Sequence, residues 1–260
     1  MNEATVFKQR LLNGLLPPLE AAGFVAGCWE GGAAATGRAD EYSDLDLCVV
    51  AAAERAPDVF ALLEATLVTN TPITHTWRVE PPPFPGMAQR FYFLAGAPRF
   101  FAVDCAVLTP EGAAQFLERE RHGKPIVLFD RAGQIAARPL DRAAHDARMW
   151  RRFEQIRASW PVYRMLVDKE LTRGRHLDAF GFYVGGVLRL LVELTGMRFR
   201  PDRFDYGWRY LHHDLPSDVQ AELRSLAWGV TPELLPDLLP RIDTLATRLT
   251  AEIEAASRAH

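Results

Sequence analysis

One short segment constrains this chain more than any other, because it places two carboxylates inside an apolar run. Asp44 and Asp46 alternate with Leu45 and Leu47, and further apolar residues follow directly. In a β-strand, side chains two residues apart point to the same face, so the pattern predicts a strand with both carboxylates on one face and the leucines on a core. Two like charges side by side on a half-buried strand repel each other and lose hydration. The segment therefore needs a partner for its carboxylates.

A divalent cation is the usual partner for such a pair. Mg²⁺ binds carboxylate oxygens and keeps coordination sites for substrate phosphates. Gly31 and Gly32 precede the segment, and a glycine turn there would admit phosphates to its backbone N–H groups. Together these features indicate metal-assisted chemistry on a nucleotide. The alternative is that Asp44 and Asp46 are polar residues at the start of a strand, where they cap a turn.

A third carboxylate, Asp104, lies within the apolar run 100–108. A single ionised aspartate in such a strand is costly unless it is paired or bound to a metal ion. Asp104 would meet Asp44 and Asp46 if the two strands are neighbours in a sheet. The three aspartates are therefore candidates for one metal or catalytic site, and an ion pair with an arginine is the structural alternative for Asp104.

The first half of the chain mixes strand and helix patterns. Apolar spacing predicts helices over 3–22, 57–67 and 109–118, and strands over 24–29, 44–51, 73–79, 90–94, 99–108 and 125–129. The strands 90–94 and 99–108 are expected to form an antiparallel pair. Pro17 and Pro18 are expected to bend or end the first helix.

After about residue 139 the strand patterns stop and amphipathic patterns of helical period take over. They predict helices over 142–159, 162–173, 177–195, 217–228 and 232–256, an arrangement typical of a helical bundle. The sequence therefore predicts an α+β protein of two domains. The first, 1–140, contains a mixed sheet, and the second, 141–260, is helical.

Composition narrows the class of partner. The net charge of −3 argues against a nucleic acid as the main partner, because proteins that bind it usually carry a basic field. Cys28, Cys48 and Cys105 lie in apolar runs without the spacing of zinc ligands, as expected of buried thiols in a reducing compartment. No apolar run approaches the roughly 20 residues of a membrane span, and the N-terminal residues lack the order of a signal peptide. We therefore expect a cytoplasmic protein that does not act at a membrane.

The motifs together resemble those of a known family. Gly31-Gly32, then Ser43-Asp44-Leu45-Asp46-Leu47, and then Asp104 on a later strand are similar to the pattern of the nucleotidyltransferase superfamily of the DNA polymerase beta type. This resemblance covers about residues 24–108. More loosely, the helical half resembles that of the small-molecule adenylyltransferases that inactivate aminoglycoside and lincosamide antibiotics. The resemblance implies a nucleotidyltransferase fold for the first domain and a helical substrate-binding second domain.

The resemblance also implies a reaction. Asp44 and Asp46 would hold Mg²⁺ on a nucleoside triphosphate, with ATP as the expected donor. Asp104 would complete the metal site, act as the general base for the acceptor hydroxyl, or do both. Gly31 and Gly32 would contact the phosphates. Attack on the α-phosphate by a hydroxyl of a small molecule would then release pyrophosphate.

One position departs from the family pattern. The family commonly has Gly-Ser in the turn, where the serine hydroxyl contacts phosphate, whereas this chain has Gly32. Ser43 and Thr36 are the candidates to supply that nucleotide-binding hydroxyl. Because of Gly32, the alternative function is a catalytically weak or inactive protein of the same fold that binds nucleotide or a protein or RNA partner. Transfer to a protein or an RNA is a further alternative, and the acidic charge disfavours RNA.

The helical half contains further candidates. Lys169 lies where the resembling family often has a basic residue that contacts the triphosphate, and a solvated helix face is the alternative. Tyr206, Trp208 and Tyr210 are aromatic candidates for lining an acceptor pocket.

Overall fold

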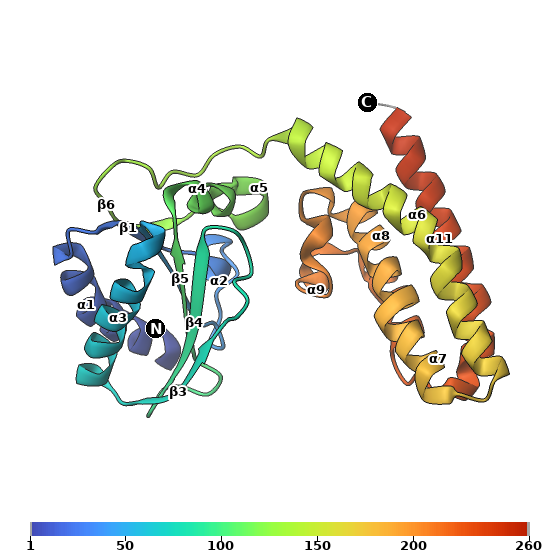
Figure 1. Ribbon diagram of the computed structural model, residues 1–260, viewed down its shortest axis with the longest axis horizontal. Coiled ribbons are helices and arrows are strands. Elements are labelled where there is room, and N and C mark those ends of the chain that lie inside the picture. The colour runs from blue at the N-terminus through green and yellow to red at the C-terminus, as the bar shows by residue number, and fades with distance from the viewer. Residues whose placement is uncertain (1, 259–260) are drawn as a thin grey trace. The chain divides into compact units, whose positions relative to one another are not determined.

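The computed structural model describes residues 2–258 and contains two units, of which the first ends at Leu140 and the second begins at Asp141. A mixed β-sheet with helices forms the first unit, and the second unit contains helices and no strand among its described residues (Figure 1). The predicted α+β class is therefore confirmed.

Six strands form the sheet of the first unit. They are β1 (Val25–Glu30), β2 (Leu45–Ala51), β3 (Ile73–Arg78), β4 (Met87–Leu94), β5 (Val103–Leu108) and β6 (Ile126–Asp130), in the spatial order β3-β4-β5-β2-β1-β6. Strands β2 and β5 are parallel, and every other neighbouring pair is antiparallel. The sheet is therefore mixed, as predicted, and its two aspartate-bearing strands lie next to each other at its centre.

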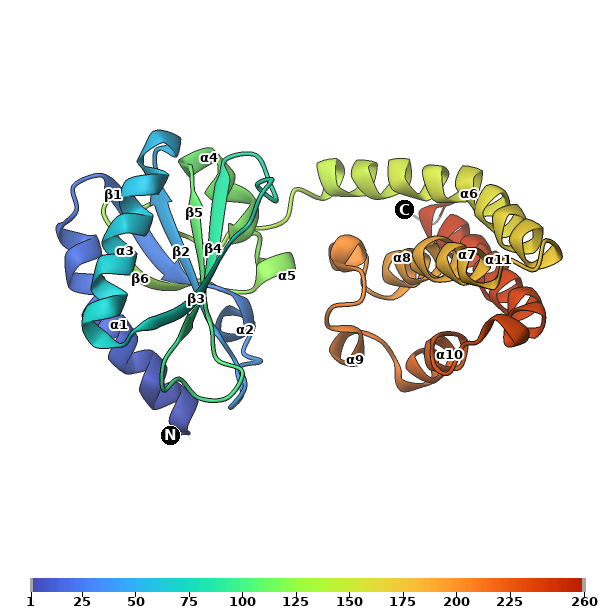
Figure 2. The same cartoon turned by 60° about the horizontal axis from the view of Figure 1, so that its bottom comes forward.

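Two helices cover one face of this sheet. Helices α1 (Glu3–Ala21) and α3 (Ala56–Asn70) lie on the same side of it, and the short α2 (Gly32–Ala35), α4 (Pro110–Ala113) and α5 (Arg119–His122) lie on the other (Figure 2). Leu45, Leu47 and Val49 of β2 pack into the core under α1 and α3. This is the burial that the alternating pattern predicts, because every second residue of a strand faces the same layer.

The opposite face of the sheet is covered only in part. Trp29, Val50 and Leu108 form a small cluster there with Leu117 and Ile135. The remaining residues on this face of β2 and β5 include carboxylates and are half-buried. The sheet thus combines one sealed face with one that is partly open.

The second unit is a set of helices around one apolar core. Its elements are α6 (Arg142–Thr172), α7 (His176–Phe182), a π-helix (Tyr183–Leu188), α8 (Arg189–Phe199), α9 (Leu211–Asp214), α10 (Ser217–Ala227) and α11 (Leu235–Arg258), with 3-10 helices at Pro201–Tyr206 and Pro232–Leu234. Apolar residues from α6, α8, α10 and α11 form the core. Among the described residues, no helix has both the length and the apolar character that crossing a membrane requires.

Prolines do not end two helices in the way that the sequence pattern suggested, and one expected helix is divided. Helix α1 continues through Pro17 and Pro18 to Ala21, and α6 continues through Pro161 where two helices were expected. Proline removes one backbone hydrogen bond and crowds the preceding turn, but buried residues on both sides of each proline hold the helix on its core. Conversely, the helix expected over 109–118 is split into α4 and a 3-10 helix, Ala114–Leu117.

Asp130, at the end of β6, provides a pH-dependent test of this fold. Its carboxylate accepts hydrogen bonds from the backbone N–H groups of Ala132, Gln134 and Ile135. Desolvation raises the pKa of this carboxyl, but the backbone N–H groups outweigh it and lower the pKa below its usual value. The charged form is therefore the one that the folded turn stabilises.

We expect Asp130→Asn to lower the melting temperature at pH 7 by about 2–4 °C, the shift that corresponds to losing about 1 kcal/mol of hydrogen bonding. The carboxylate's stabilising contribution is present above its unfolded pKa of about 3.9 and is lost as pH falls through the lower folded pKa. Melting curves of both proteins across this range should therefore converge at acidic pH. A difference that is the same at all pH values would contradict the role of the charge.

Candidate functional site

A single row of residues runs from the turn after β1 across four strands of the sheet. In the parallel pair, Asp46 of β2 lies directly opposite Asp104 of β5. On one side, the backbone N–H of Gly31 donates a 2.9 Å hydrogen bond to the carbonyl of Asp46. On the other side, Phe91 of β4 lies opposite Asp104, and Trp77 of β3 lies opposite Phe91. We call Gly31, Asp46, Asp104, Phe91 and Trp77 the site row.

The two carboxylates of the site row are neighbours on the partly open face. The residues before and after each of them pack into the core under α1 and α3, so the strand alternation turns Asp46 and Asp104 to the other side. Neighbouring strands lie about 4.8 Å apart, so the two side chains start from adjacent positions. The sequence prediction that an aspartate of β2 meets Asp104 is therefore confirmed for Asp46.

Gln89 of β4 is a site residue that the sequence analysis missed. Its Nε2 donates a 2.7 Å hydrogen bond to Oδ1 of Asp104. The expected strand began at residue 90, so Gln89 fell into the preceding loop; strand β4 in fact begins at Met87. The amide beside Asp104 therefore fixes the orientation of that carboxylate.

Cys48 lies on the same face as the two carboxylates. Burial raises the pKa of its thiol well above the usual value, and the neighbouring Asp46, Cys105 and Asp104 raise it further. A thiol with a raised pKa stays protonated at neutral pH and is a poor nucleophile. Cys48 therefore packs under the site as a small apolar residue and adds no charge to it.

Asp44 occupies a different position from its two partners. It precedes β2, and its Oδ1 accepts a 2.8 Å hydrogen bond from the backbone N–H of Ala102 just before β5. Burial raises the pKa of the Asp44 carboxyl, and the Ala102 N–H opposes that shift. Asp44 thus joins the starts of the two parallel strands. Its predicted role as a metal ligand stays a prediction.

The glycine turn passes directly over Asp46. Gly32 begins α2 with a φ of +54°, a value that side-chain-bearing residues rarely adopt. A Cβ atom at this position would overlap with Oδ2 of Asp46. A side chain at position 32, such as the serine that the resembling family has here, would therefore displace the Asp46 carboxylate from this arrangement.

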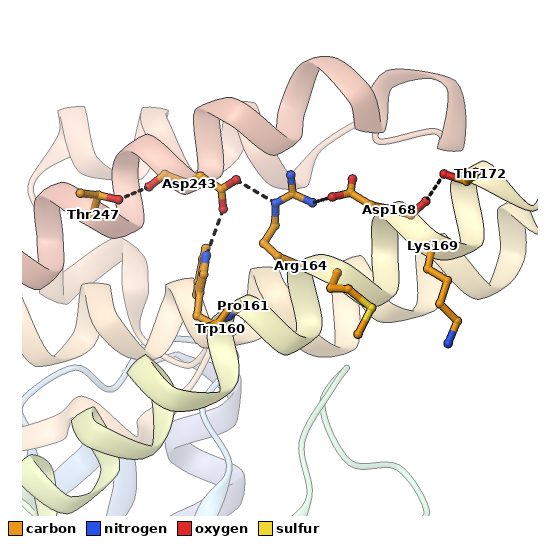
Figure 3. Close-up of a pocket in the computed structure, with 9 residues that line it drawn as sticks. Trp160, Pro161, Arg164, Asp168, Lys169, Thr172, Asp243 and Thr247 are labelled. Atoms are coloured by element: carbon orange, nitrogen blue, oxygen red, sulfur yellow. Dashed lines mark hydrogen bonds and ion pairs between the residues drawn. The ribbon is translucent and has the colours of Figure 1, made fainter.

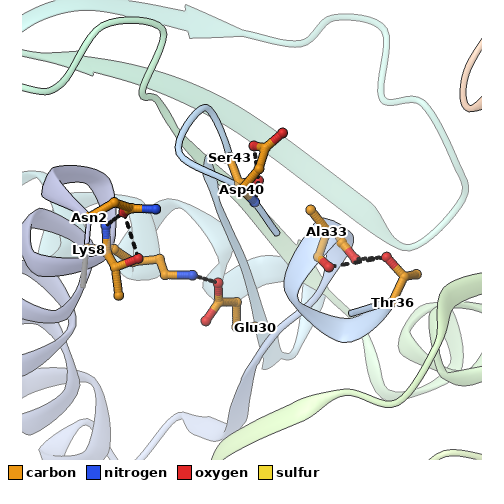
Figure 4. A network of polar contacts seen from close by, with 9 residues as sticks. Asn2, Lys8, Glu30, Ala33, Thr36, Asp40 and Ser43 are labelled. Carbon is orange, nitrogen blue, oxygen red and sulfur yellow. Dashed lines mark hydrogen bonds and ion pairs between the residues drawn. The ribbon is translucent and has the colours of Figure 1, made fainter. Parts of the chain in front are cut away.

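The loop after the turn uses its own hydroxyl groups (Figure 4). The Thr36 Oγ1 lies 3.2 Å from the carbonyl oxygens of both Gly32 and Ala33. Ser43 Oγ donates to Oδ1 of Asp40 at 2.9 Å and accepts from the Asp40 backbone N–H at 2.8 Å. Both hydroxyls thus stabilise the loop itself, and their predicted contact with phosphate stays a prediction.

The donor set of the site suits a cation that arrives with its substrate. Within residues 2–258, no group of three or more His, Cys, Asp or Glu side chains is placed to hold a metal ion. Asp46 and Asp104 alone offer two adjacent carboxylates under a turn without side chains. Mg²⁺ typically takes one or two protein carboxylates and completes its coordination with substrate phosphates and water. These residues therefore fit a magnesium–nucleotide complex.

Lys169 lies in the second unit and not in the site row. It lines a cavity of about 660 Å³ on α6 and α11. The centre of that cavity is a network in which Arg164 and Trp160 both donate to Asp243, and the Lys169 side chain points away from this network (Figure 3). Its predicted contact with a triphosphate stays a prediction.

A second cavity in the helical unit, of about 600 Å³, includes one of the aromatic candidates. Trp208 lines it together with Phe204, and Arg152 and Arg189 pair with Glu193 in its wall. Tyr206 and Tyr210 are not among its lining residues. The aromatic acceptor pocket predicted from the sequence stays a prediction.

Solved structures that are similar to this chain include two adenyltransferases. No protein-family model and no curated protein matches this chain. An aminoglycoside 6-adenyltransferase from Bacillus subtilis is 12% identical over 95% of this chain and 90% of its own, with a TM-score of 0.42. A spectinomycin adenyltransferase from Enterococcus faecialis, solved with ATP and spectinomycin, is 10% identical over 96% of this chain and 99% of its own, with a TM-score of 0.35.

Replacing Gly32 tests the close packing of the turn on Asp46. Gly32→Ala forces a side chain into a positive-φ position, which costs about 1–2 kcal/mol, and adds an overlap with Asp46 that typically costs about 1–3 kcal/mol more. Gly37→Ala is the matched control, because Gly37 has a φ of +68° and no atom within 4 Å of an added Cβ. Urea unfolding should show the larger loss for Gly32→Ala. Equal losses in both variants would contradict the contact.

Proposed function

We propose that this protein is a Mg²⁺-dependent nucleotidyltransferase that moves AMP from ATP to a hydroxyl of a small molecule and releases pyrophosphate. The observation that carries the proposal is the direct opposition of Asp46 and Asp104 on parallel strands beside a glycine turn. Two adjacent carboxylates that are partly buried repel each other and lose hydration, so their juxtaposition is typical of a site that binds a cation.

The turn and the carboxylates would divide the work of binding the nucleotide. Gly31 and Gly32 form a turn without side chains, with Gly32 packed on the Asp46 carboxylate and the Gly31 N–H bonded to the Asp46 carbonyl, and we assign phosphate binding to backbone N–H groups that follow in this turn. Asp46 and Asp104 would hold the Mg²⁺ that accompanies the triphosphate. When bound, the metal supplies charge neutralisation at the phosphates and at the entering and leaving oxygens.

We assign Asp104 the role of general base for the acceptor hydroxyl. In the reaction, the acceptor oxygen forms a bond to the α-phosphorus, the bond from that phosphorus to the pyrophosphate oxygen breaks, and the acceptor proton moves to a base. Asp104 would take this proton at a carboxylate oxygen, with Gln89 holding Oδ1 in place. Asp46 lies directly beside the glycine turn, which suits it to the metal.

The charge of the chain agrees with a small acceptor. The net charge of −3 does not provide the basic field that a nucleic-acid acceptor would need. This favours a small molecule over RNA.

The first test is removal of each carboxylate in turn. We expect Asp46→Asn and Asp104→Asn each to lower pyrophosphate release from Mg²⁺-ATP and acceptor by about 100-fold or more, as losses of catalytic charged groups typically do. Asp58→Asn, an exposed aspartate on α3, is the control that should retain activity. Unchanged release by Asp46→Asn would refute the proposal. Binding of Mg²⁺-ATP without turnover would leave a nucleotide-binding protein instead.

The second test concerns Gln89 as a positioning residue. Gln89→Leu removes the amide that holds Asp104 while keeping the residue's approximate size, so we expect kcat to fall about tenfold, the equivalent of one hydrogen bond to a charged group. The KM for ATP should stay unchanged. Gln89→Asn should remain less active than the wild type, because its shorter side chain does not reach Asp104. Steady-state kinetics measures both values. A rise in the KM for ATP without a change in kcat would contradict this role.

A further inference from the structure

The site row does not end at the carboxylates but continues onto aromatic side chains. Phe91 and Trp77 are stacked, with ring centroids 5.2 Å apart and an interplanar angle of 19°. His75 and Phe93 form the next pair along the same strands, with centroids 5.9 Å apart. Of the Trp77 side chain, 53% is exposed, and of Phe93, 46%. We call these four residues the aromatic platform.

The register places the aromatic platform on the carboxylate face of the sheet. Phe91 lies opposite Asp104, so both point to the same side. The residues that alternate with it, Arg90 and Tyr92, point to the other side and both contact Glu64 of α3. Tyr92 is therefore buried on the helix-covered face, and the rings of the aromatic platform lie on the open face.

Packing of the protein's core does not account for these rings. Trp77, Phe91 and Phe93 belong to none of the three apolar clusters of the described chain. Exposed aromatics near the edge strand of a sheet are a liability, because they invite association with other chains. Rings held in this way next to a pair of carboxylates are typical of a binding surface.

The order of groups along the site row indicates that the acceptor binds at the aromatic platform, and this step rests on the proposed function. The glycine turn lies on one side of Asp46, and the aromatic platform lies on the far side of Asp104. In phosphoryl transfer the attacking and leaving oxygens are roughly in line. With the phosphates at the turn, the acceptor therefore approaches from the side of β4 and β3, which is the side of the platform.

We propose that Trp77 and Phe91 bind the acceptor by stacking against a ring that carries the reacting hydroxyl. Phe91 is one strand from Asp104, about 4.8 Å, and Trp77 is one strand further. A six-membered ring lying on the pair therefore brings a substituent on its edge to the Asp104 carboxylate. Open-chain alcohols offer no flat apolar face and gain nothing from the platform.

Kinetics of Trp77 variants test this assignment. The acceptor panel contains ring compounds (spectinomycin, kanamycin and myo-inositol) and open-chain ones (glycerol and mannitol), with pyrophosphate release as the readout. We expect turnover of ring acceptors only, an increase of about tenfold in acceptor KM for Trp77→Ala, and near-wild-type values for Trp77→Phe. Trp228→Ala, which removes an exposed tryptophan of the helical unit, is the control. A rise in the KM for ATP instead would indicate that the adenine ring of ATP binds to the platform, and this would overturn the proposal. An unchanged KM for both substrates would overturn it as well.

A binding measurement separates this proposal from the proposed function. In the full chain labelled with 5-fluorotryptophan, the ¹⁹F signal of Trp77 is the one absent from Trp77→Phe. Ring compounds should shift this signal, and mannitol and Mg²⁺-ATP alone should not. A shift without any pyrophosphate release would retain the ring site and refute the transferase activity. The proposal would be overturned if no ring compound shifted this signal. It would also be overturned if the signal of the free protein showed no solvent isotope shift, because the chain itself would then cover the ring.

Discussion

The parallel pairing of β2 with β5 is the interaction on which the rest of this structure depends. Parallel neighbours need a long crossover, and here α3, β3 and β4 supply it before the chain returns as β5. The same pairing sets Asp46 against Asp104 and lets Asp44 join the strand starts through Ala102. A shift of one residue in this register would turn one carboxylate into the core under α1 and α3.

The surroundings of the two carboxylates show how the fold accommodates them. Because Gly32 has no side chain, the turn can pass over Asp46, and the Gln89 amide donates a hydrogen bond to Asp104. Both contacts hold the carboxylates at defined positions on the partly open face of the sheet.

One face of the sheet carries both the carboxylates and the aromatic platform. Because β3 and β4 extend the sheet from β5 outward, the site row runs from a bare turn through two carboxylates to stacked rings. Phosphate, metal and acceptor would follow one another in that order. Gly32, which departs from the serine of the resembling family, belongs to this arrangement, since the carboxylate that it covers is the one at the centre of the row.

The sequence by itself determined the elements and their faces. The alternation around Asp46 and Asp104 fixed both residues on strands with an apolar opposite side, and the change of period near residue 139 separated a sheet-bearing part from a helical one. Local patterns have periods of two or 3.6 residues, so they cannot say which distant strand is a neighbour. Only the tertiary structure decided that Asp104 meets Asp46 while Asp44 binds Ala102, that Gln89 belongs to the site, and that Trp77 continues the row. Each of these depends on strand order and register, which backbone hydrogen bonds between residues far apart in the chain establish.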